Sequence, residues 1–549
     1  IDVGGGDFTI AWAGTPIMEL DTNSMLFQST GTGTSNTIFG KNAGDSIASG
    51  GNYNALFGEN AGTALTTGDK STFIGYGAGD TAVATVDNTA IGYNSLTANQ
   101  YGSSNIAIGS NAMFTSLCDG RNVAIGHGTL YTANSTPSGT SAANTYNIGI
   151  GYNAGYAITT GLSNILVGGS AGLALTTSSY NIAIGRNALI SEDVAVGNIA
   201  IGFETMEDCN DDDGNYNIAM GYQSMNACTN PGSYNIAMGF QALDSSGVVA
   251  DSNIAIGAHA MGAGAVTGSH QIAIGRDALY ELTDGTYNIA MGYRALFSDT
   301  VGELNTAIGS YALYSCVDGD ENVGIGYQTL YSYEGGDGEG DNTAVGAKAG
   351  YYTETGELNT YVGWGAGYGA SNSTSGDANT LIGAKAGYLV QSTGAGNTCL
   401  GYSAGESATD ASSLTLIGRE AGADIDDTAA NGTVLIGAYA GAALTSGTEN
   451  TALGYQALQT ATDSDRNTAV GYQALQMLPG ADGDTDNTAV GAYAGAKITT
   501  GLRNTAVGSL VLDVLLTGND NVAIGYGAMS AANTDESRCV AIGSNALIA

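Results

Sequence analysis

The segments NTALGYQALQ (residues 450–459) and NTAVGYQALQ (residues 467–476) differ at one aliphatic residue and begin 17 residues apart. The same pattern, Asn-[Thr/Ile/Val]-x-[Ile/Val/Met/Leu]-Gly-x-x-Ala, recurs around twenty-nine glycines, from Gly40 to Gly543. Sixteen of the twenty-eight intervals between these glycines are 17 residues long, and only the interval from Gly126 to Gly151, at 25, exceeds 20. A fixed short period is the signature of a repeat protein, so this pattern decides the fold.

Within each repeat, the motif alternates in the period-2 manner of a β-strand. In residues 88–92, for example, Asn88, Ala90 and Gly92 share one face, whereas Thr89 and Ile91 share the other. We expect the second half of each repeat, such as LTTGDKST, to form another short strand and a polar turn. Two strands and two turns make one coil of a parallel β-solenoid, an all-β fold. Twenty-nine coils stacked about 4.8 Å apart would give a rod on the order of 140 Å long.

The most regular positions have predicted structural roles. Asn stands four residues before the glycine in twenty-four of the twenty-nine copies, and identical amides in one register are expected to hydrogen-bond one another along the axis. The glycine is expected to provide a positive φ or a close backbone approach, and the small residue three positions later to face a cramped interior. The predicted asparagine ladder includes Asn88, Asn105, Asn122, Asn181, Asn450 and Asn467.

The composition limits the possible partners. Residues 36–549 read as one continuous repeat domain, and residues 1–35, which lack the motif, are interpreted as an entry or cap segment. The chain has thirteen basic and fifty-one acidic residues, which give a net charge of −38. This charge would repel nucleic acid and anionic membrane surfaces. The sequence has no run of eighteen apolar residues, so we expect no membrane insertion.

Three copies of the motif resemble a known family. NIAIGSNAM (residues 105–113), NIAIGRNAL (181–189) and AIGSNALIA (541–549) are similar to the head repeats of trimeric autotransporter adhesins, the YadA-like family, which also occur in phage tail fibres. The resemblance implies a β-roll three chains wide, and therefore a homotrimer, in an extracellular virion appendage or cell-surface fibre. The repeat is longer here than is usual in that family. The thin interior of a two-strand coil independently favours burial of its aliphatic columns against other chains.

These observations predict a non-enzymatic extracellular fibre protein, a rigid rod for adhesion or receptor contact, in a phage tail fibre or a surface adhesin. Two alternatives stay open: a self-assembling extracellular filament joined head to tail, and a fibre-borne polysaccharide depolymerase. The three histidines fall at unrelated positions of the repeat, and no HExxH or P-loop pattern occurs. We therefore predict no catalytic residue and no organic cofactor.

The residue after the repeat glycine is aromatic in many coils, which predicts a column of rings. Such a column could meet a cell-surface glycan, a receptor or a partner chain. Alternatively, the rings stack between coils or are buried at a seam between chains. The predicted aromatic column includes Tyr76, Tyr93, Tyr222, Tyr293, Tyr455 and Tyr472.

Two acidic turns are candidate Ca²⁺ sites, because this cation takes six to eight oxygen ligands at flexible geometry. The candidate ligands are Asp211, Asp212 and Asp213 in one turn and Asp337, Glu339 and Asp341 in the other. The segment GGDGEGD (residues 335–341) approaches the calcium-binding GGxGxD motif, but Gly340 stands where that motif has Asp. Solvated, charge-bearing loops are the simpler alternative.

Cysteine spacing predicts one further contact. Cys209 and Cys228 each lie seven residues after a repeat glycine, in adjacent coils. Stacking in one register would bring the two residues within disulfide reach. A disulfide would suit an extracellular protein, and a pair of stacked thiols is the alternative.

Overall fold

The structure is a computed structural model, which describes residues 8–12, 15–20, 25–26 and 33–547, apart from 118, 134–142, 192, 210–213, 229, 231, 245–248, 265, 337–339, 370–375, 391–393, 427, 480–482 and 532–533. The chain divides into two compact units, residues 1–270 and residues 271–549.

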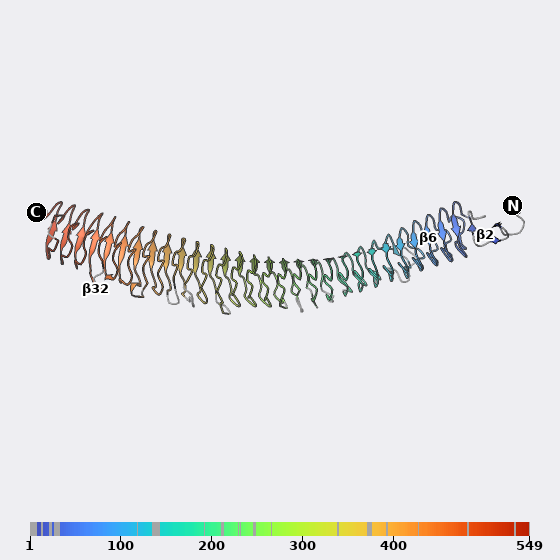
Figure 1. Ribbon diagram of the computed structural model, residues 1–549, viewed down its shortest axis with the longest axis horizontal. Helices are drawn as coiled ribbons and strands as arrows, with labels where there is room; N and C mark the ends of the chain where they lie inside the picture. Colours follow the sequence, from blue (N-terminus) through green and yellow to red (C-terminus); the bar gives the residue numbers. More distant parts are fainter. Residues whose placement is uncertain are drawn as a thin grey trace. The chain divides into compact units, whose positions relative to one another are not determined.

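Both units are parallel β-solenoids, as the repeat predicts. Each repeat contributes one three-residue strand, and within each unit this strand pairs in parallel and in register with the strand of the next repeat, as Ala90 does with Ala107 and Ala107 with Ala124. Figure 1 shows these strands as a row of arrows standing side by side. The strands of the first unit are β1 (Phe8–Trp12), β2 (Thr15–Leu20), β3 (Met25–Leu26), β4 (Thr37–Phe39), β5 (Ala55–Phe57), β6 (Thr72–Ile74), β7 (Thr89–Ile91), β8 (Ile106–Ile108), β9 (Asp119–Gly120), β10 (Val123–Ile125), β11 (Ala143–Asn144), β12 (Ile148–Ile150), β13 (Ile165–Val167), β14 (Ile182–Ile184), β15 (Ile199–Ile201), β16 (Ile218–Met220), β17 (Ile236–Met238) and β18 (Ile254–Ile256).

The second unit continues the same plan and adds one short 3₁₀ helix, η1 (Thr428–Ala430). Its strands are β19 (Ile272–Ile274), β20 (Ile289–Met291), β21 (Thr306–Ile308), β22 (Val323–Ile325), β23 (Thr343–Val345), β24 (Thr360–Val362), β25 (Thr380–Ile382), β26 (Thr398–Leu400), β27 (Thr415–Ile417), β28 (Val434–Ile436), β29 (Thr451–Leu453), β30 (Ser464–Asp465), β31 (Thr468–Val470), β32 (Gly483–Asp484), β33 (Thr488–Val490), β34 (Thr505–Val507), β35 (Val522–Ile524) and β36 (Val540–Ile542).

The expected second strand in every coil is wrong in detail. Among the described residues, the second half of the repeat forms short parallel pairs only between β9 and β11 and between β30 and β32, together with two isolated bridges. Elsewhere it consists of turns whose backbone N–H groups donate to carbonyls of the next coil, as Thr66 N does to Val83 O at 2.9 Å. The polar, glycine-containing turn residues satisfy the backbone between coils without a continuous strand.

The strand buries one face and leaves the other partly exposed. The central residue, such as Ala107 in β8, is fully buried, while the flanking Ile106 and Ile108 point outward. The small residue after the glycine, such as Ala112, and the following Met113 are also fully buried. The core is therefore a thin stack of mostly small and aliphatic side chains, one layer per coil.

The repeat glycine is required by both its conformation and its surroundings. Gly92 has a φ of +138°, and a Cβ added there would lie 2.6 Å from the carbonyl oxygen of Gly109 in the next coil. Real Cβ atoms do not approach backbone atoms so closely, so only glycine fits this corner.

The backbone geometry that recurs from coil to coil also places non-glycine residues in the left-handed region of φ and ψ. In the coil of Gly92, these residues are Asp87, Asn94 and Leu96, with φ values of 59°, 52° and 53°. Asparagine and aspartate adopt this conformation more readily than leucine does. The buried Leu96 side chain contributes apolar contacts that offset its backbone cost.

The asparagines form a buried ladder in each unit. Some of their amides hydrogen-bond one another as predicted, as Asn467 Nδ2 does to Asn450 Oδ1 at 3.1 Å, and backbone N–H groups add further bonds. The backbone N–H of Asn105 donates to Asn88 Oδ1 at 2.8 Å, and that of Asn122 donates to Asn105 Oδ1 at 2.9 Å. Each side-chain Nδ2 typically donates to a carbonyl in the turn before the next asparagine, as from Asn105 to Asp119 O at 2.8 Å. Asn181, Asn450 and Asn467 hold the same position in their coils.

The ladder is interrupted where Leu414 and Thr433 replace asparagine. Leu414 donates its N–H to Asn397 Oδ1 at 3.0 Å, but its side chain offers no acceptor to the following coil. The N–H of Thr433 turns instead to Ala430 O of η1 at 3.3 Å. The buried Thr433 Oγ1 has no hydrogen-bond partner among the described residues, so this is the weakest step of the ladder.

The segment before the first repeat has a different topology. β1 and β2 form an antiparallel pair, and β3 pairs antiparallel with β4, with Met25 opposite Phe39. The predicted division at residues 35 and 36 thus falls between β3 and β4, the first strand of the parallel series.

Candidate functional site

Two surfaces differ in composition from the rest of the described chain. The first, which we call the sheet face, consists of the two outward columns of the parallel strands, one residue and three residues after each ladder position. None of the twenty-nine repeats has a charged residue at either place, although the chain carries sixty-four charged residues in total. The outward side chains are partly exposed, for example Ile184 at 38% and Met238 at 37%.

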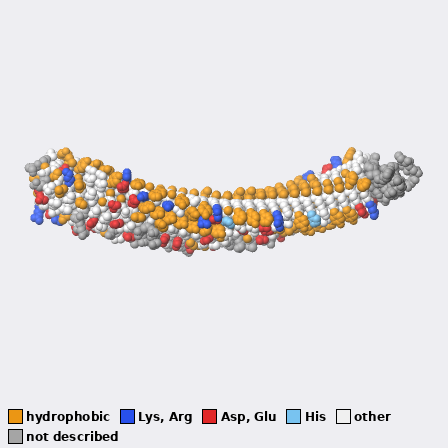
Figure 2. Space-filling model, viewed as in Figure 1, with side chains coloured by type: hydrophobic (Ala, Val, Ile, Leu, Met, Phe, Trp, Pro, Cys, Tyr) orange, Lys and Arg blue, Asp and Glu red, His pale blue; other side chains and the backbone are white. Residues whose placement is uncertain are grey.

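The sheet face differs between the two units. From β8 to β18 in the first unit, nine successive coils carry an aliphatic residue in both outward columns. In the second unit, the column that directly follows the ladder position is Thr in ten of the sixteen coils. Figure 2 shows rows of hydrophobic side chains that run along the length of the first unit, from coil to coil. Its sheet face is therefore the more apolar of the two.

The predicted aromatic column is present on the turn that follows the sheet, and its rings are half-exposed. Tyr76 stacks on Tyr93 with ring centroids 5.5 Å apart, and Tyr455 stacks on Tyr472 at 5.3 Å. Tyr222 stacks between two phenylalanines, Phe203 and Phe240, whereas Tyr293 meets Tyr311 edge to face at 5.1 Å. Tyr93 keeps 55% of its surface exposed. Within this chain, the rings thus stack between coils without being buried.

A second aromatic column lies five residues after the repeat glycine, and the sequence analysis missed it. In the second unit, seven rings in seven successive coils stack face to face, with centroid separations from 4.8 to 5.3 Å. The signal was available in the sequence, because an aromatic residue occupies the same position in each of these repeats. The seven rings belong to Tyr280, Phe297, Tyr314, Tyr331, Tyr351, Tyr368 and Tyr388.

The two columns come together in the second unit as an aromatic ridge, which we define as residues 293–298, 310–315, 327–332, 347–352, 364–369 and 384–389. These thirty-six residues include eleven aromatic and three basic residues but no acidic residue. Figure 2 shows this gathering of hydrophobic side chains with Lys and Arg among them. In a chain with a net charge of −38, the ridge is a local island of positive charge.

The three basic side chains lie against the rings. The Arg294 guanidinium is 5.0 Å from the centroid of Phe297, Lys348 Nζ is 5.3 Å from that of Tyr351, and Lys385 Nζ is 5.4 Å from that of Tyr388. Such cation–π contacts are worth about 0.5–1 kcal/mol at exposed sites. Arg294 and Lys385 also pair with carboxylates, at 3.3 Å and 2.8 Å. No carboxylate among the described residues lies within 4 Å of Lys348.

The tyrosines of the second column have altered acidity. Burial among the stacked rings raises the pKa of the Tyr331, Tyr351 and Tyr368 hydroxyls, and the neighbouring tyrosines add to the effect. Like any tyrosine hydroxyl at neutral pH, they are protonated and can donate hydrogen bonds at the surface of the ridge.

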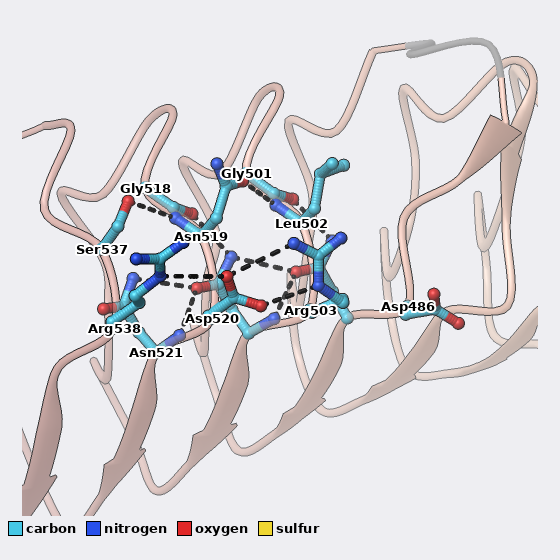
Figure 3. Close-up of polar contacts among 12 residues, drawn as sticks. Asp486, Gly501, Leu502, Arg503, Gly518, Asn519, Asp520, Asn521, Ser537 and Arg538 are labelled. Carbon is cyan, nitrogen blue, oxygen red and sulfur yellow. Dashed lines mark hydrogen bonds and ion pairs between the residues drawn. The ribbon is translucent and has the colours of Figure 1, made fainter.

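The last coils of the second unit carry a column of alternating charge at the position before the ladder residue (Figure 3). Arg503 Nε donates to Asp520 Oδ1 at 2.7 Å, and Arg538 lies 3.9 Å from the same carboxylate. The arginine partners lower the pKa of Asp520 and likewise that of Asp486, which pairs with Arg466 at 2.8 Å. These side chains are exposed, so each pair contributes little to stability and the column is not a binding site in itself.

Figure 3 also shows a second hydrogen-bonded ladder beside the asparagines. The N–H of Leu502 donates to Asn519 Oδ1 at 2.7 Å, and the N–H of Asn519 donates to Ser537 Oγ at 2.9 Å. Short polar residues two positions before the ladder recur in many coils for this reason. The hydrogen bonds of this second ladder explain why these turn positions are polar without requiring that their side chains bind a metal ion.

The predicted Ca²⁺ sites remain predictions. Asp211, Asp212, Asp213, Asp337 and Glu339 lie outside the described residues. Asp341 is described and exposed, and its N–H donates to Asp320 O at 3.2 Å. The part of the chain that the structure covers contains no group of three or more His, Cys, Asp or Glu side chains arranged to hold a metal ion.

The two candidate cysteines are both fully buried. Cys209 Sγ lies 3.2 Å from Met225 O, and Cys228 Sγ lies 3.5 Å from Leu243 O. Each sulfur atom thus approaches a carbonyl of the following coil. The Cys209–Cys228 disulfide stays a prediction.

The buried carboxyl of Asp299 is the most unusual titratable group of the core. Its Oδ1 accepts the N–H of Gly302 at 2.8 Å, whereas Oδ2 has no partner among the described residues. Burial raises the pKa of Asp299 well above its usual value. The Cys316 thiol, one coil further on in the same register, also has a raised pKa because of burial and the nearby Asp299.

The comparisons with known proteins do not assign a family. No protein-family model matches the sequence, and a search of curated proteins finds no match. None of the described helices is long and apolar enough to cross a membrane.

Proposed function

We propose that the protein is a non-enzymatic extracellular fibre protein whose copies associate side by side through the sheet face, as a homotrimer. The fibre then acts as a rigid spacer that contacts a cell surface, in a phage tail fibre or a surface adhesin. The observation that carries the proposal is the sheet face of the first unit. It is aliphatic in both columns over nine successive coils and uncharged in a strongly acidic chain.

The size of the hydrophobic effect favours association over many coils. Full burial of an aliphatic side chain is worth about 1.5–3 kcal/mol, so covering the exposed third of one is worth roughly 0.5–1 kcal/mol. Two outward residues in each of nine coils therefore offer on the order of 10 kcal/mol, comparable to the association cost of about 4–15 kcal/mol. One or two coils offer far less than this cost, whereas the whole face offers an amount comparable to it.

A charge-matched pair of variants tests this proposal. Ile218→Lys, Ile236→Lys and Ile254→Lys together place three charges on the sheet face in successive coils. The control places the same three charges in the same coils at the position before the ladder, by Tyr216→Lys, Tyr234→Lys and Ser252→Lys. Lysine is tolerated at that position, because Lys70 occupies it with a φ of 54°.

We expect sedimentation to show the isoleucine variant as a monomer and the control as the oligomer of the unmodified protein. Equal masses for the two variants would contradict association through the sheet face. The head-to-tail filament predicts a different result, because both variants would then remain polymers.

A further inference from the structure

We propose that the aromatic ridge of the second unit binds an acidic polysaccharide, with one sugar ring placed between Tyr327 and Trp364 and its carboxylate on Lys348. This inference deepens the adhesive role proposed above and rests on it. It does not depend on the oligomeric state, which is measured separately.

Ring geometry locates the contact. In the second column the rings stack on one another, so their faces are covered and only their edges and hydroxyls remain for a ligand. The first column is different here, because Ala347 separates Tyr327 from Trp364. Both aromatic side chains are 49% exposed. The column therefore lacks one ring, and the two flanking rings belong to coils about 10 Å apart.

A ligand ring at the level of Ala347 would continue the stacking pattern of the protein. Neighbouring stacked rings of the ridge are separated by 4.8–5.3 Å, which is half the distance across the missing position. Trp364 stacks on Tyr388 of the next coil at 6.2 Å, so its other face is turned toward Ala347. A polysaccharide chain that crosses the ridge at right angles to the stack presents its sugar faces to both rings.

Charge selects an acidic ligand. Lys348 immediately follows Ala347, and no carboxylate among the described residues neutralises it. The ridge itself contains no acidic residue. At physiological salt, charges interact over about 8 Å. Because Arg294 and Lys385 already pair with carboxylates, Lys348 is the side chain that attracts the ligand. The protonated hydroxyls of Tyr331, Tyr351 and Tyr368 can donate hydrogen bonds to sugar oxygens.

Three polymers separate the parts of the proposal in a binding titration at 0.15 M salt. Alginate offers sugar rings and carboxylates, dextran offers rings without charge, and polyglutamate offers carboxylates without rings. We expect the unmodified protein to bind alginate more tightly than dextran or polyglutamate. The protein has two tryptophans, so Trp12→Phe leaves Trp364 as the only one, and its fluorescence should change when alginate binds.

Matched variants locate the site. We expect Trp364→Ala to weaken alginate binding about tenfold through lost ring contact and Lys348→Gln about fivefold through lost charge. Alanine at the Trp364 position is compatible with the fold, because Ala347 and Ala384 occupy the same place in neighbouring coils. The control is Tyr76→Ala with Tyr93→Ala, a half-exposed ring pair at the same repeat position in the first unit, which should leave the affinity unchanged.

The proposal is overturned if alginate does not bind, if polyglutamate or dextran binds equally well, or if the Tyr76 and Tyr93 control weakens binding as much as Trp364→Ala. None of these three outcomes depends on how many chains the particle contains, so a failure here is distinguishable from a failure of side-by-side association.

Discussion

The two units have the same type of coil and differ in the side chains that their coils expose. In the first unit, the sheet face is aliphatic in both columns over nine coils and the aromatic residues form short stacks. In the second unit, threonine occupies much of one outward column of the sheet face, while eleven aromatic and three basic residues belong to the aromatic ridge. A solenoid coil fixes its inward residues and leaves the outward ones free to vary, so one fold can present an assembly surface in one unit and a ligand surface in the other.

The largest expected effect concerns what the units have in common. Gly92→Ala in the first unit and Gly363→Ala in the second each place a Cβ 2.6 Å from backbone atoms of the next coil, at φ values of +138° and +132°. We expect each substitution to destabilise its unit by about 3 kcal/mol or more. Chemical denaturation measures the loss. Gly169→Ala is the control, because an added Cβ there meets nothing within 4 Å, and an equal loss at Gly169 would contradict the role of close approach.

The sheet faces of the two units are expected to contribute unequally to association. Thr343→Lys, Thr360→Lys and Thr380→Lys place three charges on the sheet face of the second unit, as the isoleucine variant does in the first. Because threonine is already polar, we expect these changes to shift the association equilibrium much less than the isoleucine changes do. Sedimentation at matched concentrations measures the difference, and equal dissociation by the two variants would show that both faces carry the interface.

A pH-dependent difference is expected at Asp299. Its folded-state pKa is raised above the ordinary value of 3.8, so the fold favours the protonated acid. The contribution of the protonated Asp299 to folding stability is fully present below pH 3.8, the ordinary pKa. It is lost as the pH rises through the higher folded-state pKa. Asp299→Asn should equal the native protein in stability near pH 3.5 and exceed it by about 1–3 kcal/mol at pH 8.

Unfolding curves across this pH range test the effect of Asp299, with the exposed Glu321→Gln as control. In the first unit, Asn99 occupies the same place in its repeat, which shows that an amide fits this position. A pH-independent difference between Asp299→Asn and the native protein would contradict a buried neutral carboxyl.

The smallest expected effect concerns the interrupted ladder of the second unit. Leu414→Asn with Thr433→Asn would restore the acceptors that the intact ladder of the first unit has in Asn105 and Asn122. We expect a gain of about 1 kcal/mol in resistance to denaturant. Asn105→Leu should produce a loss of similar size, and a loss in both experiments would show that the backbone at η1 excludes the amide.

The sequence predicted the shared part of the molecule better than the variable part. The period, the inward Asn and Ala and the glycine corner follow from strict repetition, because each coil imposes the same packing on the next. The second strand was predicted wrongly, since turns such as that at Thr66 satisfy their backbone groups between coils. The first aromatic column was predicted, but the second column, which includes Tyr314 and Tyr331, was not, because the residue five positions after the glycine is aromatic in only some of the repeats.

Outward residues resist prediction for a physical reason. Their identity is not constrained by the core, so a run of rings or of isoleucines acquires meaning only when the coils place it on one surface. Lys348 illustrates this limit: its position over Tyr351 at 5.3 Å and its lack of a described carboxylate partner are visible only in three dimensions.

The measurement that tests the central claim most directly is the mass of the particle in solution, by sedimentation equilibrium over a range of concentrations and salt. The chain has a mass of 54.9 kDa, and side-by-side association predicts a defined particle of three chains, favoured by salt because each copy carries a charge of −38. A mass of 54.9 kDa at every concentration and salt would contradict the account.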